Sequence, residues 1–134
     1  MSDSLRERVA ERAVGRCEYC LYPESDSLIP HQLDHIVAQQ HGGADREDNL
    51  ALCCAVCNRY KGPNLTSIDP KTGEVTRLFH PRKHVWEVHF YLVEERIVGL
   101  TPEGRTTAFL LRVNDEERLE ERKALIAVGR YGVG

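Results

Sequence analysis

The chain has 134 residues, the length of one domain or of a small core with an appended segment. It carries 18 Lys and Arg against 21 Asp and Glu, a formal net charge of −3, which argues against a histone-like or tail-driven nucleic-acid binder. A hydrophobic fraction of 41% and a charged fraction of 29% are those of an ordinary globular protein. The sequence has neither an apolar stretch long enough to cross a bilayer nor an apolar signal core at its start. We therefore expect a cytoplasmic protein without membrane contact.

The first half of the chain predicts one helix, one strand and a second compact apolar segment. Residues 3–14 have the spacing of a short amphipathic helix, and residues 21–28 are typical of a loop. Residues 29–37 predict a strand, which a Gly- and Asp-rich loop follows over residues 40–48. Residues 49–61 are compact and apolar, and the pair Gly62-Pro63 ends any helix that they contain.

The second half predicts strands followed by two helices, which makes the expected fold class α+β. Residues 64–84 carry turn signals and form either a long arm or a small hairpin. Residues 85–100 are the most strand-like stretch, with a turn near Glu94-Glu95. Thr101 is a suitable N-cap for a helix through about Val113, and residues 114–116 suit the start of a last helix that ends near Gly129.

Five cysteines are the unusual feature of the composition. Four of them lie in two C-x-x-C pairs, Cys17/Cys20 and Cys54/Cys57, and Cys53 is left over. In a chain without an export signal disulfides are disfavoured, so metal binding is the better interpretation. Four thiolates from two tight turns suit tetrahedral Zn²⁺ and leave no position for a substrate, so the zinc would be structural. The pairs are further apart than in common zinc ribbons, and a bound zinc would close a long loop.

Two other interpretations of the cysteines stay open. A thioredoxin-like redox pair needs a βαβ context and only one C-x-x-C. The cysteines could also be buried without a ligand, and Cys53 is most simply a small apolar side chain of the core.

The residues enclosed by the cysteine pairs carry a family resemblance. The stretch LDHI … GGADREDNLALCCAVCNRYKG resembles the HNH endonuclease signature over residues 14–62. The resemblance implies a small ββα-metal (His-Me finger) core, held together here by a four-cysteine zinc site, with residues 63–134 as a C-terminal extension of unknown role within one domain. The sequence departs from the signature at Asn58, where histidine is commoner. This change affects the preferred metal more than the competence of the site.

The resemblance also implies roles in hydrolysis of DNA phosphodiester bonds. His35 is the candidate general base, and Asp34 and Asn58 are candidate oxygen ligands of Mg²⁺ or Mn²⁺. Asn49 is given the supporting role of orienting the His35 imidazole. One difficulty is that strict strand alternation sends Asp34 and His35 to opposite faces, so the strand must end or bend there.

Basic residues close to Asn58 give the candidate contacts to DNA phosphates. Residues 58–84 carry a net charge of +4, while residues 1–57 and 85–134 carry −5 and −2. The candidate phosphate contacts are Arg59, Lys61, Arg82 and Lys83. Double-strand cutting by an enzyme with one site would favour a homodimer.

The main alternative function is a non-catalytic, zinc-stabilised nucleic-acid-binding or adaptor module. It needs the two cysteine pairs but not Asp34, His35 and Asn58 together. A redox or zinc-storage protein would explain neither the Asp-His pair nor Asn49. A second catalytic metal at His80, His84 and His89 is disfavoured, and His31 and His41 are expected to be packed or solvent-exposed histidines.

Overall fold

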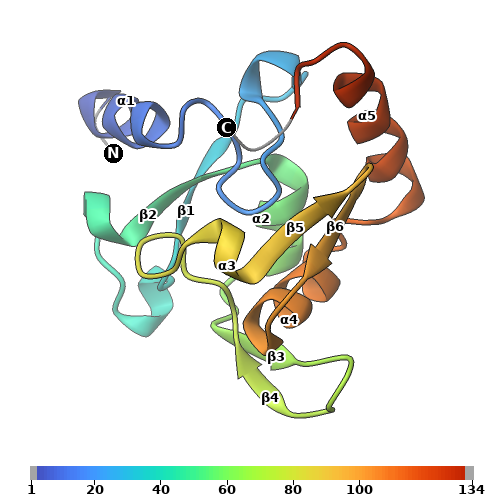
Figure 1. The fold of residues 1–134 in the computed structure, drawn as a ribbon. Coiled ribbons are helices and arrows are strands. Elements are labelled where there is room, and N and C mark those ends of the chain that lie inside the picture. Colours follow the sequence, from blue (N-terminus) through green and yellow to red (C-terminus); the bar gives the residue numbers. More distant parts are fainter. Residues whose placement is uncertain (1–2, 132–134) are drawn as a thin grey trace.

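The computed structural model describes residues 3–131 and has an α+β fold, as predicted. Three two-stranded antiparallel sheets alternate with helices along this part of the chain (Figure 1). In chain order the elements are α1 (Asp3–Arg12), β1 (Gln32–His35), β2 (Leu50–Cys53), α2 (Ala55–Lys61), β3 (Thr66–Ile68), β4 (Val75–Arg77), α3 (Trp86–His89), β5 (Phe90–Val93), β6 (Arg96–Gly99), α4 (Pro102–Leu110) and α5 (Glu116–Ala127). The predicted C-terminal hairpin and two helices are confirmed.

The hairpin β1–β2 and helix α2 form the ββα unit that the sequence resemblance implies. Strand β2 is buried along its whole length and pairs with β1, with Asp34 opposite Ala51 and His35 opposite Leu50. Helix α2 follows β2 directly because Cys54 caps it, its sulfur accepting the backbone N–H of Cys57. Helix α2 then packs against β1, although the two elements are far apart in the sequence.

Two expected elements differ from the observed ones. The first helix ends at Arg12 because Val14 and Gly15 adopt the left-handed conformation, with φ of 55° and 67°. The stretch predicted to begin a strand at residue 85 begins with the single helical turn α3, so this part of the prediction was wrong. Its Trp86 is buried and donates its indole N–H to the carbonyl of Tyr19 at 2.9 Å. This long-range contact overrides the local strand propensity.

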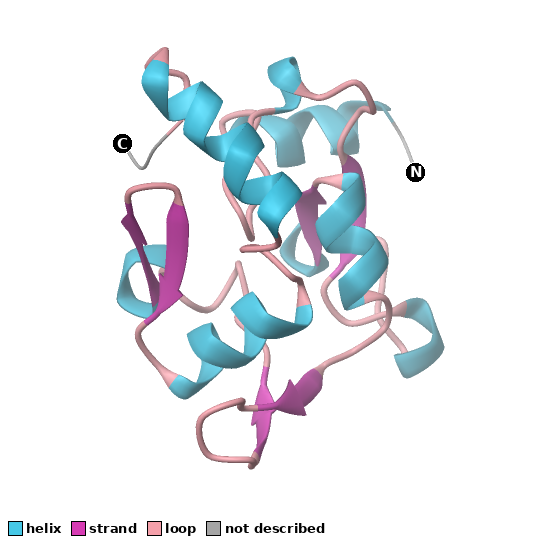
Figure 2. Ribbon diagram, turned by 90° about the vertical axis from the view of Figure 1, so that its right-hand side faces the viewer, coloured by secondary structure: helices cyan, strands magenta, loops and turns pink. Residues whose placement is uncertain are grey.

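The hydrophobic core surrounds the cysteines. The larger cluster of buried residues contains all five cysteines together with Tyr19, Phe79, Trp86 and Phe90, so both halves of the chain contribute to it. A smaller cluster packs Val9 of α1 against Leu50 and Leu52 of β2. Figure 2 shows α5 beside α2, and residues of both helices line one surface groove. The C-terminal residues thus cover the cysteine region.

Candidate active site and metal centre

The four cysteines of the two C-x-x-C pairs meet in one buried cluster. The sulfur atoms of Cys17, Cys20, Cys54 and Cys57 all lie within 4.8 Å of one another. In each pair the backbone N–H of the second cysteine points at the sulfur of the first, at 3.5 Å for Cys20 and 3.4 Å for Cys57. Such N–H groups stabilise thiolates, and four sulfurs at this spacing suit a tetrahedral Zn²⁺. The sequence prediction that these four residues come together is confirmed.

The electrostatics of the cluster favour a bound cation. Burial raises the pKa of Cys17 well above its ordinary value, and hydrogen bonding to the Cys17 thiol raises the pKa of Cys54 and Cys57. Four thiols so close together cannot all ionise unless a cation compensates their charge. All four zinc positions would be filled by protein sulfur, so such a site supports the fold and performs no chemistry. Cys53 is fully buried but is not part of the group, as expected for an apolar core side chain.

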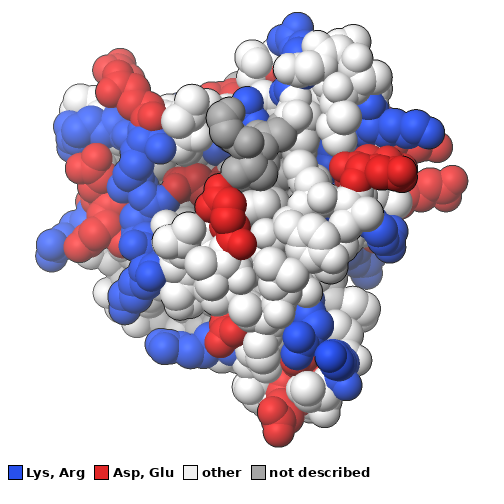
Figure 3. Space-filling view, in the orientation of Figure 1, with Lys and Arg blue, Asp and Glu red and all other residues white. Residues whose placement is uncertain are grey.

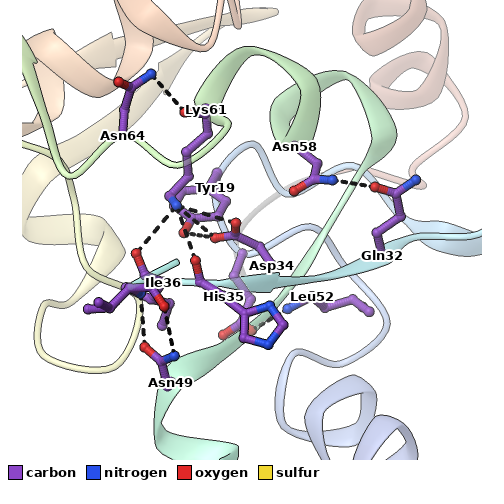
Figure 4. A network of polar contacts seen from close by, with 12 residues as sticks. Tyr19, Gln32, Asp34, His35, Ile36, Asn49, Leu52, Asn58, Lys61 and Asn64 are labelled. Atoms are coloured by element: carbon purple, nitrogen blue, oxygen red, sulfur yellow. Dashed lines mark hydrogen bonds and ion pairs between the residues drawn. The ribbon is translucent and has the colours of Figure 1, made fainter. Parts of the chain in front are cut away.

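Asp34 lies in a buried ion pair between β1 and α2. Its exposed fraction is 4%, and the Nζ of Lys61 lies 3.2 Å from its Oδ2 and 3.3 Å from its Oδ1 (Figure 4). The hydroxyl of Tyr19 donates to Oδ2 at 2.7 Å. Burial raises the pKa of Asp34, and the Lys61 ammonium and the Tyr19 hydroxyl oppose that shift. The ammonium also lies 3.4–3.5 Å from the carbonyl oxygens of His35 and Ile36. Lys61 is therefore enclosed by oxygen atoms and does not face solvent.

Asn58 lies on the same side of β1 as Asp34. Its side-chain amide donates to Oε1 of Gln32, which precedes Asp34 by two positions and shares its strand face. The side-chain NH₂ of Asn58 is therefore already hydrogen-bonded within the protein. Asn58 and Lys61 are three residues apart in α2, about one helical turn, so both side chains lie on the face of the helix that packs against β1.

His35 lies on the opposite face of β1, as the alternation rule predicts (Figure 4). Its Nε2 is 2.6 Å from Oδ1 of Asp45, and the side-chain amide of Gln39 donates to the same oxygen at 3.1 Å. The hydrogen bond from His35 lowers the pKa of Asp45. The His35 side chain is 19% exposed. The site therefore presents a carboxylate-bound imidazole near the surface, at the last residue of the strand.

Asp45 is a functional candidate that the sequence reasoning missed. It lies in the Gly-Asp-rich loop, where an acidic residue is usually a turn former. Three acidic residues share this loop, and only the fold shows which of them reaches the imidazole. The sequence predicted the strand that carries His35 and a loop at Gly42-Gly43. Neither feature predicts how the loop returns to the strand, and it is this path that brings Asp45 to the imidazole.

Asn49 holds that loop in place. Its Oδ1 accepts the N–H of Val37 at 2.9 Å, and its amide donates to the carbonyls of Val37 and Ala44, each at 3.0 Å. Gly43 lies against these groups, and a Cβ there would overlap the carbonyl oxygen of Val37. The side-chain hydrogen bonds of Asn49 thus go to the loop backbone and not to the imidazole. Asn49 positions the segment that carries Asp45.

Comparison with protein families agrees with this geometry. Residues 17–64 match the family model described as HNH endonuclease. These residues form an HNH endonuclease domain. Searches of curated proteins and of solved structures find no significant match. The match begins at the first cysteine of the cluster and includes the hairpin β1–β2 and helix α2.

The basic residues around the HNH domain differ in their availability to a nucleic acid. Lys83 is exposed, and Arg59 is exposed with its guanidinium 5.0 Å from the centre of the Tyr60 ring. Lys61 is buried on Asp34, and Arg82 forms an ion pair with Glu18 and is only 15% exposed. Burial lowers the pKa of Arg82 to about 10. Figure 3 shows Lys and Arg side chains interspersed with Asp and Glu on the side where α1 and the β1–β2 hairpin lie.

The other histidines of the chain do not assemble a second metal site. His84 lies between His80 and His89, with ring centroids 6.2 Å and 4.9 Å away. The Nδ1 atoms of His80 and His84 accept backbone N–H groups, and Nδ1 of His89 bonds to Thr101. Within residues 3–131, the cysteine cluster is the one group of His, Cys, Asp and Glu with metal-binding spacing. His31 is buried and His41 is exposed, as expected.

Among the described residues no helix is long and apolar enough to span a membrane.

Proposed function

We propose that this HNH domain is a metal-dependent endonuclease that hydrolyses phosphodiester bonds of DNA. The observation that carries the proposal is the hydrogen bond between His35 and Asp45 at the end of β1, one residue after Asp34. Membership of the HNH family implies a nucleic-acid substrate. The exposed Arg59 and Lys83, within the basic segment 58–84, suit contacts to the phosphate backbone.

Asp34 and Asn58 would hold a catalytic divalent cation. A carboxylate offers about four lone-pair positions. Tyr19 and Lys61 together use three of those of Asp34. The amide of Asn58 donates to Gln32 and leaves its own oxygen as a ligand. One carboxylate oxygen, one amide oxygen and water suit Mg²⁺ or Mn²⁺. When bound, that ion would act as a Lewis acid on the phosphate and the leaving oxygen.

His35 would act as the general base. With its Nε2–H donating to Asp45, its Nδ1 lone pair is free to take a proton from water. The resulting hydroxide attacks phosphorus, and the bond from phosphorus to the 3′ oxygen breaks. The 3′ oxygen leaves with the bonding electron pair and takes a proton from solvent. Asp45 stabilises the imidazolium that forms and keeps the ring in orientation.

A non-catalytic DNA-binding module is the second candidate. The observation in its favour is the ion pair of Asp34 with Lys61, because a protein cation already neutralises this carboxylate. Such a module would bind DNA without cleaving it and would not depend on His35.

Plasmid nicking separates the two functions. The zinc-loaded protein should nick supercoiled DNA with Mg²⁺ or Mn²⁺, and His35→Ala should abolish nicking while the zinc content stays at one per chain. The matched control is His41→Ala, since His41 is an exposed histidine outside the site. If wild type and His35→Ala have equal residual activity across several divalent metals, the catalytic proposal fails and the binding module remains.

A further inference from the structure

The C-terminal helix α5 places a guanidinium against the cysteine cluster. The Nη2 of Arg118 lies 3.2 Å from the sulfur of Cys57 and 3.7 Å from that of Cys54. Its Nη1 donates to the carbonyl of Leu111 at 2.7 Å, which fixes the side chain at the first turn of the helix. Arg118 lies outside residues 17–64, the range of the HNH match. A residue of the second half of the chain thus contacts the metal centre of the first half.

The charge of Arg118 complements that of the cluster. Zn²⁺ bound by four thiolates carries a net charge of about −2, and burying that charge without a counterion is costly. An arginine guanidinium is always protonated in proteins, so Arg118 presents a permanent positive charge to the sulfurs of Cys57 and Cys54. Hydrogen bonds of this kind to metal ligands commonly tune affinity by about 10–100-fold.

Arg118 also lies where the cluster comes closest to solvent. Cys17, Cys20 and Cys57 are fully buried, whereas Cys54 is 7% exposed. Cys54 and Arg118 line the same surface groove between α2 and α5. A competing ligand that enters this groove therefore meets Cys54 and Arg118 together.

We propose that Arg118 retains the zinc of the HNH domain, both by neutralising the Cys54 and Cys57 thiolates and by covering the exposed side of the cluster. The second half of the chain then determines how slowly the nuclease core loses its structural metal. This role is independent of whether the domain cleaves DNA.

Zinc release to a chromogenic chelator tests the proposal on the full-length zinc-loaded protein. Arg118→Met keeps the apolar stem and should lose zinc at least about tenfold faster than wild type. Arg118→Lys keeps the charge on a shorter side chain, so its rate of zinc release should lie between those of wild type and Arg118→Met. The matched control is Arg105→Met, which removes the ion pair between Arg105 and Asp69. This variant should lower the stability of the protein without changing any contact to the cysteine sulfurs.

A second measurement separates a metal-centre role from loss of stability. In cobalt-substituted protein the sulfur-to-cobalt charge-transfer band should shift in Arg118→Met and Arg118→Lys but not in Arg105→Met. The proposal is overturned if the Arg118 variants release zinc at the wild-type rate, or if Arg105→Met accelerates release as much at an equal loss of Tm. If Arg118→Met does not fold, the zinc-release rate and the cobalt spectrum of Arg118→Lys test the proposal by the same criteria.

Discussion

Nε2 of His35 lies 2.6 Å from Oδ1 of Asp45, a residue ten positions further along the chain. This distance is that of a charge-assisted hydrogen bond, which fixes the orientation of the ring at the end of β1. The pair links the strand to the loop that Asn49 clamps. It therefore couples loop geometry to the proton transfer proposed for His35.

Asp45→Asn should lower the rate of plasmid nicking, because the amide orients the imidazole poorly and does not stabilise its charged form. General-base catalysis contributes about 10²–10⁴-fold, so we expect a loss of at least about tenfold in kcat. Asp48→Asn, an exposed acidic residue of the same loop, is the control and should be unaffected. Equal rates for the two variants would remove Asp45 from the mechanism.

Cys17→Ser should abolish stoichiometric zinc binding and unfold the core, because one of four ligands is lost from the centre of the main hydrophobic cluster. Structural zinc contributes about 10–16 kcal/mol in small zinc domains. Cys53→Ser changes an equally buried cysteine that is not in the group, so it should keep one zinc per chain. Zinc content and circular dichroism check both outcomes. An unchanged Tm in Cys17→Ser would contradict the structural role.

Lys61→Met should destabilise the protein, since it leaves the Asp34 carboxylate buried without its cation. Breaking a buried pair from one side costs about 3–5 kcal/mol. The double variant Asp34→Asn/Lys61→Met should recover part of that loss in urea unfolding of zinc-loaded protein. Lys123→Met, on the exposed face of α5, provides the comparison and should change little. A Lys61→Met midpoint equal to that of wild type would show that the pair contributes nothing.

Asp69 should make stability depend on pH in the acid range. Its carboxylate accepts two hydrogen bonds from Arg105 of α4, and this pairing lowers its pKa to about 2. The unfolded chain binds this proton more tightly, with a pKa of about 3.9. The contribution is therefore fully present above pH 4 and is lost as the pH falls toward 2.

The measurement compares the Tm of wild type and Asp69→Asn at pH 7 and pH 3. The variant should melt lower at pH 7, and the difference should narrow at pH 3. Protons compete with zinc for the cysteines equally in both proteins, so the difference in Tm between them reports the contribution of the Asp69 carboxylate. Glu74→Gln, at the other end of the β3–β4 turn, should track wild type. A difference that widens at pH 3 would contradict the assignment.

The sequence predicted the parts of the site that depend on local spacing. The cysteine pairs, a strand that contains Asp34 and His35, and the helix ending before Gly62 follow from residue types at fixed intervals, although the strand was predicted over residues 29–37 and is shorter at both ends. Contacts between distant segments were not predictable. The pairing of Asp34 with Lys61 needs the packing of α2 on β1, and that of His35 with Asp45 needs the path of the loop. The helical turn at Trp86 depends on the carbonyl of Tyr19, 67 positions earlier in the chain.

The position of Arg118 has a consequence for how the protein is made. A chain grows from its N-terminus at about 5–20 residues per second, so Cys57 is synthesised about 3–12 s before Arg118. All four sulfurs are thus available to a metal before the guanidinium that contacts them exists. During that interval a nascent chain would exchange its metal with the surrounding pool faster than the finished protein, and with the role proposed for Arg118 the completion of the last helix would slow the exchange.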